Sequence, residues 1–596
     1  MNGPAAGVPF LDVSRSATGR RWVDRLPEGS LRLVRGVAEQ LELPEIVARI
    51  LLARGVDPDE AGLFLEPKLR ELMPDPRTLT DAESAASRIA DAVEANERIG
   101  IFGDYDVDGA TSSALLGRFL MALGVKADIH IPDRIFEGYG PNEAAFERFR
   151  SQGCTLVVTV DCGTASHDTI AGARAKGLDV VVIDHHQTGE TLPQANALVN
   201  PNRQDDISGQ GHLAAVGVVF LVLVETLRQL RERGRDDLPN LLQWLDLVAL
   251  GTVADVVPLT GLNRAYVSQG LKIMRRRDNA GLRALSDVAR LRDAPTPYHL
   301  GFLIGPRINA GGRIGDAALG ARLLTCDDPE QAAAMAAQLD RLNSERQALE
   351  QEALAQAMSE AEAADATGAP VIVVASDDWH PGIVGLIASR LKERFRKPAI
   401  AVSFASGAQG SGSARSVAGV DIGAAVRAAV DEGLLVKGGG HAMAAGMTVE
   451  RGRLDAFREA VGASLMEAVA VASLRDELRI DGAITAAAAG KDLVHNIERA
   501  GPFGAGHPEP VLALPAHRLT YCEATEQGHF RLGLAGPDST KIQGIAFRSA
   551  DTPLGAFLSE KRGQNIHAAG ALRLNRWGGS ETVQLQLRDA ADPAKG

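Results

Sequence analysis

Apolar residues in the first half of the chain occur in short runs that alternate with helical patterns. Four runs are predicted to be strands, at residues 98–104, 125–133, 155–161 and 178–184. The segments between them place apolar residues at helical spacing, as in NEAAFERFRSQG and HDTIAGARAKG. Short apolar strands that alternate with helices indicate a parallel sheet covered on both faces. We therefore expect an α/β domain here, preceded by short helices over residues 40–95.

The second half shows three further patterns. Residues 327–366 are predicted to form one long helix, because their one proline lies in the first turn and they contain no glycine. A second α/β pattern follows and ends in the glycine-rich VKGGGHAMAAGMTV. From about residue 470, five strand-like runs with polar turns are typical of a small β-barrel of the oligonucleotide-binding (OB) type.

The expected fold class is α/β, with two α/β lobes joined by a long helix, plus a C-terminal OB-like β-barrel. The predicted boundaries are an N-terminal extension at 1–40, a catalytic domain with a helical N-terminal part at 41–326, the connecting helix at 327–366, the second lobe at 367–465 and the barrel at 466–596.

Composition and charge narrow the class of protein. With 596 residues the chain is too long for one core, and 45% hydrophobic with 23% charged residues is typical of globular proteins. The net charge of −13 argues mildly against a nucleic-acid partner. Residues 271–313, however, hold nine Lys/Arg against three Asp. Since an acidic protein can carry one basic groove, net charge does not decide the question.

The compartment is predicted to be the cytoplasm. The N-terminal residues lack the apolar core of a signal peptide, and the longest apolar run, VGVVFLVLV at 216–224, is too short to span a bilayer. The four cysteines show neither disulfide density nor zinc-binding spacing.

Acidic residues and histidines follow the predicted strands. The stretch IFGDYDVDG puts Asp104, Asp106 and Asp108 close together, where they repel one another unless a cation or a proton offsets the charge. Asp161 ends the third strand, and the sequence Asp-His-His at 184–186 ends the fourth. Any one such Asp is more often a helix cap, and a solvated acidic turn is an alternative for the first group. Because ligands bind at the carboxyl ends of parallel strands, the residues taken together favour one site.

A further aspartate, Asp255, interrupts the apolar stretch LVALGTVADVVPL. A buried carboxylate needs a partner, which can be a helix N–H, a cation on another side chain or a metal ion. A set of Asp and His suits Mg²⁺ or Mn²⁺, and the imidazoles favour Mn²⁺. Two such ions about 3.5–4 Å apart clamp the attacking and leaving oxygens in phosphoryl hydrolysis. We therefore expect two divalent metal ions, Mn²⁺ or Mg²⁺.

These motifs resemble the DHH phosphoesterase superfamily, through DYDVDG, TVDCG, DHH and GTVADVVPL. Further stretches, HIPDRIFEGYG, GPRINAGGRIGD, WHPGIVGLIASRLKERF, GSARSVAGVDI and GGGHAMAAG, are similar to its branch of single-stranded-DNA-specific 5′→3′ exonucleases, in continuous order over residues 40–515. The resemblance implies a metal-dependent phosphodiester hydrolase that releases 5′-mononucleotides and acts in DNA recombination and repair.

The resemblance also implies residue roles. Asp106 would hold one metal and Asp161 would bridge both, while Asp108, His185 and Asp255 would hold the other. Asp104 would be a further metal ligand that compensates for Phe102, which stands where the pyrophosphatase branch has a histidine. His186 would contact the scissile phosphate or orient its neighbour, and Asp184 would fix the tautomer of a ligating histidine. The implied catalytic set is Asp106, Asp108, Asp161, His185, His186 and Asp255.

Substrate contacts are expected from arginines and from a glycine-rich turn. Arginines suit forked phosphate contacts, and glycines let backbone N–H groups approach a phosphate. A tight turn with a packed His441 is the alternative for the glycines. The expected substrate-binding residues are Arg134, Arg307, Asn309, Arg313, Ser413, Arg415, Gly439, Gly440 and His441.

Single-stranded DNA is the expected partner, with single-strand-binding protein and a helicase as further candidates, no membrane, and a monomeric state. Two alternatives remain open. One is another DHH phosphodiesterase, an oligoribonuclease or a cyclic-dinucleotide hydrolase, although a terminal β-domain is not expected in those branches. The other is a non-catalytic nucleic-acid-binding scaffold, which the intact Asp and His positions disfavour.

Overall fold

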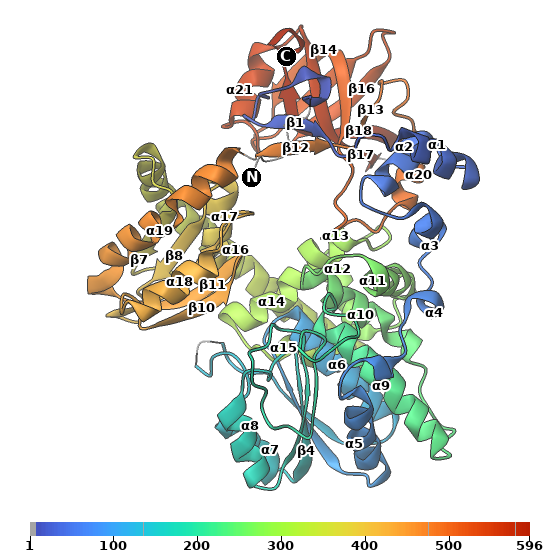
Figure 1. The fold of residues 1–596 in the computed structure, drawn as a ribbon, viewed down its shortest axis with the longest axis vertical. Helices are drawn as coiled ribbons and strands as arrows, with labels where there is room; N and C mark the ends of the chain where they lie inside the picture. The colour runs from blue at the N-terminus through green and yellow to red at the C-terminus, as the bar shows by residue number, and fades with distance from the viewer. Residues whose placement is uncertain (1–7, 135, 475, 578–579, 596) are drawn as a thin grey trace. The chain divides into compact units, whose positions relative to one another are not determined.

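The computed structural model describes residues 8–134, 136–474, 476–577 and 580–595 (Figure 1). The chain forms two compact units. The larger consists of residues 73–258 and 265–475, and the smaller of residues 1–72, 259–264 and 476–596. Each unit is described in turn. Within the described residues, no helix has both the length and the apolar character needed to cross a membrane.

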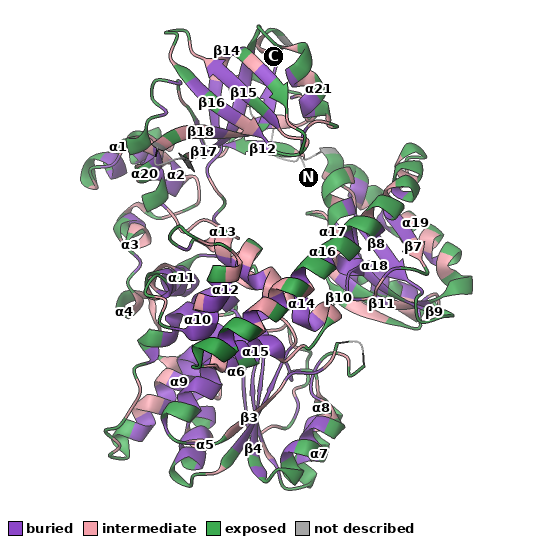
Figure 2. Cartoon of the chain, turned by 180° about the vertical axis from the view of Figure 1, so that it is seen from behind, coloured by how far each residue is buried: buried purple, intermediate pink, exposed green. Residues whose placement is uncertain are grey.

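The first lobe of the larger unit is built on a parallel sheet with strand order β3-β2-β4-β5-β6. Its strands are β2 (Arg98–Gly103), β3 (Ala127–His130), β4 (Cys154–Val160), β5 (Asp179–Ile183) and β6 (Ala197–Val199). The first four confirm the predicted strands, and β6 is a short addition. Helices α7 (Glu143–Ser151) and α8 (His167–Ala175) cover one face, while α5 (Ala82–Glu94) and α9 (Ala215–Glu232) lie on the other. The central strands are buried, as expected for a sheet covered on both faces (Figure 2).

Further helices follow along the chain and lead to the second lobe. The first is α6 (Val107–Ala122), followed later by α10 (Leu245–Ala254), α11 (Gly261–Met274), α12 (Ala280–Val288), α14 (Gly305–Ile314) and α15 (Leu319–Thr325). The long helix α16 (Pro329–Ala366) then confirms the predicted connecting helix. Asp328 caps it, because its carboxylate accepts hydrogen bonds from the backbone N–H groups of Glu330 and Gln331.

The second lobe holds a mixed sheet of order β10-β11-β9-β8-β7. The strands are β7 (Ile372–Ser376), β8 (Ala399–Ser403), β9 (Gln409–Arg415), β10 (Lys437–His441) and β11 (Ala444–Glu450). Helices α17 (Val384–Phe395), α18 (Ile422–Asp431) and α19 (Leu454–Leu474) pack against it. The glycine-rich stretch expected to be a turn is therefore mostly the edge strand β10, paired antiparallel with β11.

The C-terminal strands of the smaller unit close into a barrel. Strands β14 (Leu512–Ala524), β15 (Phe530–Ala535), β16 (Lys541–Ala546), β18 (Ser580–Ala591) and β17 (Asn565–Trp577) pair in that order, and β14 also pairs with β17. The five runs predicted to be strands correspond to these five. The predicted barrel is thus confirmed, together with the two α/β lobes and the helix that joins them.

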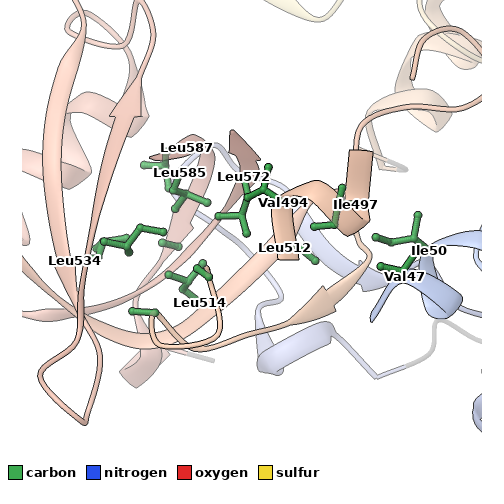
Figure 3. Close-up of a cluster of buried hydrophobic side chains, with 14 of the residues drawn as sticks. Val47, Ile50, Val494, Ile497, Leu512, Leu514, Leu534, Leu572, Leu585 and Leu587 are labelled. Carbon is green, nitrogen blue, oxygen red and sulfur yellow. The ribbon is translucent and has the colours of Figure 1, made fainter. Parts of the chain in front are cut away.

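The N-terminal residues belong to the same unit as this barrel. Strand β1 (Arg21–Asp24) pairs in parallel with β12 (Glu477–Ile480), and the Trp22 indole N–H donates to Asp589 at 3.0 Å. Helix α2 (Glu45–Leu52) places Val47 and Ile50 in one buried cluster with α20 (Lys491–Arg499) and barrel leucines (Figure 3). The sequence placed residues 41–72 in the catalytic domain. An amphipathic helix shows that one face is buried but not what covers it.

Candidate metal centre

Three neighbouring strands bring acidic residues to one edge of the first sheet. In the parallel register, Gly103 of β2 is paired with Val160 of β4, and Val160 with Ile183 of β5. Each strand ends at that level, so the residues that follow lie side by side at the carboxyl edge. These are Asp104, Asp161 and the sequence Asp184-His185-His186.

The remaining residues of the DYDVDG motif are fixed by the start of α6. The helix begins at Val107 because Asp106 is its N-cap and accepts hydrogen bonds from the N–H groups of Asp108 and Gly109 at 2.9 and 3.1 Å. The capping alternative is therefore true of Asp106, through one of its two oxygens. Asp108 is buried in the first turn and accepts from the N–H groups of Ala215 and Val216.

His185 stands at the middle of the acidic residues. Its Nε2 lies 3.3 Å from Asp161 Oδ1, 3.7 Å from Asp255 Oδ2 and 3.9 Å from Asp108 Oδ2. Its Nδ1 lies 3.1 Å from the carbonyl oxygen of Leu213. A carbonyl can only accept, so Nδ1 carries the proton and the Nε2 lone pair points at the carboxylates. This is the tautomer that a metal-binding histidine requires.

The side chains present fit divalent cations. Within the described residues, buried Asp104 Oδ1, Asp161 Oδ1 and His185 Nε2 have no hydrogen-bond partner. Unpaired buried acceptors are costly, and acceptors that face one another are suited to a cation. Three groups place their ligand atoms within 4.8 Å: Asp161–His185–His186, Asp108–His185–Asp255 and Asp104–Asp106–Asp161. The groups share Asp161 and His185, as two neighbouring ions would require.

The electrostatics of the metal-free site agree with this fit. Burial, followed by the charge of Asp106, raises the pKa of Asp108 to about 7. Burial, followed by the charges of Asp108 and Asp106, raises the pKa of Asp255 to about 9. Burial also raises the pKa of Asp104 and of Asp161 well above the usual range. The site therefore binds protons where a metal ion would supply the missing positive charge.

Metal binding should consequently release protons. Since Asp108 and Asp255 have pKa values raised to about 7 and about 9, the metal-free protein holds protons on them near pH 7, and Mn²⁺ must displace these protons. The affinity for Mn²⁺ should therefore rise from pH 6 to pH 9 and fall as the pH is lowered. Calorimetric titration with Mn²⁺ in two buffers of different ionisation enthalpy measures the protons released. An affinity that is constant over this range would contradict the assignment.

Asp184 orients the ring of His186. It accepts hydrogen bonds from the N–H groups of Thr164, His185 and His186 and from His186 Nδ1, the last at 2.8 Å. Burial alone would raise the pKa of Asp184, but the hydrogen bond and the charge of His186 outweigh it and lower the pKa. Asp184 was expected to fix the tautomer of the ligating His185; it holds His186, while the Leu213 carbonyl holds His185.

In the metal-free site, His186 consequently favours its protonated form at neutral pH. Burial would lower its pKa, but the hydrogen bond and charge of Asp184 raise the pKa to about 9. The Tyr139 hydroxyl lies 3.2 Å from His186 Nδ1. A charged imidazolium at the rim of a metal site is suited to bind a phosphate oxygen.

Two backbone features keep these groups close. Asp161 has a φ of 61°, a left-handed conformation that is uncommon for a residue other than glycine and is often found at functional sites. Gly251 lies on α10, which ends just before Asp255. A Cβ at Gly251 would lie 2.3 Å from Thr111 Oγ1 and 2.9 Å from Asp108 Oδ1. Only glycine therefore allows α10 to approach α6 this closely.

Three of the expected substrate-binding arginines lie near one another. Burial, followed by the charges of Arg134, Arg346 and Arg415, lowers the pKa of Arg313 to about 10. Burial, followed by the charge of Arg134, lowers the pKa of Arg415. The Arg415 guanidinium donates to Ser413 Oγ at 2.9 Å, and the Arg313 guanidinium donates to the Gly382 carbonyl at 3.1 Å. Mutually repelling guanidinium groups are suited to bind an anion.

The other expected substrate residues are placed differently. Arg307 pairs with Asp340 of α16 at 2.9 Å and donates to the Leu303 carbonyl, so it serves contacts within the protein. Asn309 is half-buried on α14. Gly439, Gly440 and His441 lie in strand β10, where His441 is exposed and not packed.

Several residues around the site carried no sequence signal. Asn200 donates to Thr164 Oγ1 at 3.0 Å and to the His186 carbonyl at 2.9 Å, and Leu213 sets the His185 tautomer through a main-chain atom. A main-chain contact leaves no trace in residue type. Tyr139 lies in the quoted stretch HIPDRIFEGYG, so its contact with His186 could have been suspected from that motif.

Adjacent parallel strands that end in Asp, Asp and Asp-His-His around a shared metal site define a DHH phosphoesterase. Residues 98–252 match the model of the DHH family, N-terminal domain; residues 368–467 match the DHHA1 domain, and residues 480–589 the RecJ OB domain. The single-stranded-DNA-specific exonuclease RecJ of Escherichia coli is 34% identical over 572 residues, which cover 91% of this chain and 95% of that protein. The chain therefore belongs to the RecJ family.

Solved structures agree with this membership. The crystal structure of RecJ in complex with Mn²⁺ from Thermus thermophilus matches with a TM-score of 0.79 at 30% identity, covering 95% of this chain and 78% of that one. The complex of RecJ from the same organism with Mg²⁺ matches with a TM-score of 0.73 at 29% identity, covering 95% of this chain and 77% of that one. Those two complexes contain Mn²⁺ and Mg²⁺, and the clustered Asp and His side chains of this chain offer ligand atoms suited to such ions.

Proposed function

We propose that this protein is a metal-dependent exonuclease that degrades single-stranded DNA. The observation that carries the proposal is the set of Asp and His side chains that meet at Asp161 and His185, on a chain that belongs to the RecJ family. Bound divalent ions would supply a metal-activated water and would stabilise charge on the leaving oxygen. Phosphodiester hydrolysis is the reaction that this chemistry serves.

The carboxylates and the histidines of the site would have different roles. Asp161 lies between the ligand groups and would bridge the two ions; Asp104 and Asp106 would complete one site, and Asp108, His185 and Asp255 the other. His186, held as a cation by Asp184, would donate a hydrogen bond to the scissile phosphate. Tyr139 would limit the rotation of the His186 ring. These individual roles are proposals.

We further propose that cleavage proceeds 5′→3′ and yields 5′-mononucleotides. An exonuclease needs a group that recognises the terminus, since it would otherwise cut internally. The cluster of Arg134, Arg313 and Arg415 is the candidate, because its repelling charges favour a phosphate among them. Ser413, which accepts a hydrogen bond from Arg415, would aid in orienting that guanidinium.

Other features of the biological setting stay predictions. These are a cytoplasmic location, a monomeric state, a role in DNA recombination and repair, and association with a single-strand-binding protein and a helicase.

Substrate comparison tests the proposed function. The purified protein with Mn²⁺ should shorten single-stranded DNA faster than duplex DNA or short oligoribonucleotides of the same sequence. Preference for oligoribonucleotides would favour the alternative of another DHH phosphodiesterase. Binding of single-stranded DNA without any change in its length would favour a non-catalytic scaffold.

The barrel should contribute to DNA binding more than to hydrolysis. A truncation that tests this must also remove the N-terminal helices that pack against the barrel. Because Val47 and Ile50 are buried in the cluster that also holds barrel leucines, loss of residues 476–596 alone would expose the apolar face of α2. We expect that truncated protein to aggregate in size-exclusion chromatography. Removal of residues 1–72 together with 476–596 should leave a soluble protein with weaker DNA binding and a similar kcat at saturating substrate. Unchanged affinity would contradict a role of the barrel in binding.

A further inference from the structure

An exposed aromatic pair lies on the chain between α12 and α14. Tyr298 belongs to α13 (Pro297–His299), and Phe302 to the π-helical turn η5 (Leu300–Ile304), which leads into α14. Tyr298 is 54% exposed and Phe302 67% exposed. The two rings stack, with centroids 5.0 Å apart and an angle of 25° between their planes. Rings of this size are usually largely buried, so this pair presents an open aromatic face.

The turn that contains the aromatic pair packs next to the segments that contain the metal ligands. Leu300 and Ile304 are buried beneath it. A Cβ added at Gly305 would lie 3.7 Å from both Ala254 and Val107. Ala254 directly precedes Asp255, and Val107 lies within the DYDVDG motif. Single π-helical turns occur frequently at functional sites. The aromatic pair is therefore continuous with the metal centre within one compact unit.

The stretch of chain that leads to the pair carries two exposed arginines. Arg290 and Arg292 are exposed and precede Tyr298 in the basic segment 271–313. Proteins that hold single strands combine cationic groups for the phosphates with aromatic side chains on which bases stack. The position of the pair beside the segments that carry metal ligands favours a single strand as its occupant.

We propose that Tyr298 and Phe302 form a stacking platform for the bases of the single strand that is cut at the metal centre. The proposal rests on the proposed function and adds a contact to the bases, where the metal and arginine residues contact phosphates. Since every base has a π-face, such a platform binds strands without regard to sequence. It would also disfavour duplex DNA, whose bases are already stacked on one another.

The test measures release of the first nucleotide from oligonucleotides that carry one abasic site at successive positions. In the wild-type protein, kcat/KM should fall by about fivefold or more when the missing base is the one on the platform. Phe302→Ala should lower kcat/KM on the intact strand by a similar factor and should lose the dependence on that base. Phe302→Trp should retain it. The kcat at saturating substrate and the affinity for Mn²⁺ should stay unchanged.

Controls separate this inference from the proposed function and from misfolding. Met466→Ala, which truncates another exposed apolar side chain on α19, should behave as wild type. If the wild-type protein releases nucleotides but shows no dependence on any single base, the platform is overturned without use of a variant. Equal abasic profiles in the wild type and in Phe302→Ala would overturn it as well. If the wild-type protein releases no nucleotide from single-stranded DNA, the proposed function itself has failed.

Discussion

Asp161→Asn should reduce hydrolysis of single-stranded DNA by a factor on the order of 10³ or more while leaving the fold intact. Asp161 lies in two of the three ligand groups, and its buried Oδ1 finds no hydrogen-bond partner among the residues that the structure describes. Loss of its charge would weaken both ions, and metal ions contribute several kcal/mol to stabilising the transition state. Asn is preferred to Ala here because Asn tolerates the left-handed φ of 61° at this position.

The control for this variant lies at the opposite end of the same sheet. Asp179 begins β5, and its Oδ2 accepts a hydrogen bond from Arg88 at 2.6 Å. Asp179→Asn should retain activity, and thermal unfolding should show both variants folded. Calorimetry should find weaker Mn²⁺ binding only in Asp161→Asn. Turnover close to wild type in Asp161→Asn with saturating Mn²⁺ would refute the bridging role.

Arg415→Ala should weaken the use of 5′-phosphorylated single strands by roughly 10- to 150-fold. The range corresponds to about 1.5–3 kcal/mol for a charge-assisted hydrogen bond to a phosphate. The loss should be much smaller for strands with a 5′-hydroxyl. Arg415 is half-buried and donates a hydrogen bond to Ser413; burial, followed by the charge of Arg134, lowers its pKa, so an anion bound there would relieve the repulsion.

The measurement is kcat/KM on the two end chemistries for wild type and variant. Arg458→Ala, which removes an arginine paired with Asp455 and Glu360 elsewhere in the second lobe, is the matched control and should change neither value. Equal losses on both ends in Arg415→Ala would mean that Arg415 serves the general path of the backbone and does not recognise the terminus.

The first lobe and its acidic residues could be predicted from sequence because short apolar runs alternate there with segments of helical spacing. Apolar runs fix the parallel strands, and parallel strands bring the residues that follow them to one edge. This argument alone places Asp104, Asp161 and Asp184 at the same edge of the sheet. Asp255 was found through a charge within an apolar stretch, since a buried carboxylate needs a partner. Each of these signals can be seen in a short stretch of sequence, and the folded sheet brings the residues concerned close together.

Other parts of the structure depend on contacts that the sequence does not encode locally. The glycine-rich sequence predicts a turn at Gly438–Gly440, yet these residues form strand β10, because pairing with β11 overrides the low strand propensity of glycine. Arg307 and Arg313 lie in the same sequence motif and look alike there. Arg307, however, donates a hydrogen bond to Asp340 on α16, a residue distant in sequence. The sequence does not show which histidine ring Asp184 binds, because that depends on how the Asp-His-His turn folds. In the structure the Leu213 carbonyl accepts a hydrogen bond from the His185 ring, and Asp184 accepts one from the His186 ring.

The most direct test of the account follows the two ends of one single-stranded oligonucleotide in time with Mn²⁺, labelled at the 5′ end in one sample and at the 3′ end in the other. The account predicts that the 5′ label is released at once as a mononucleotide while the 3′ label moves through a ladder of shortening strands, and that EDTA stops both. Release of the 3′ label first, internal fragments from either label, or undiminished cleavage in EDTA would contradict it.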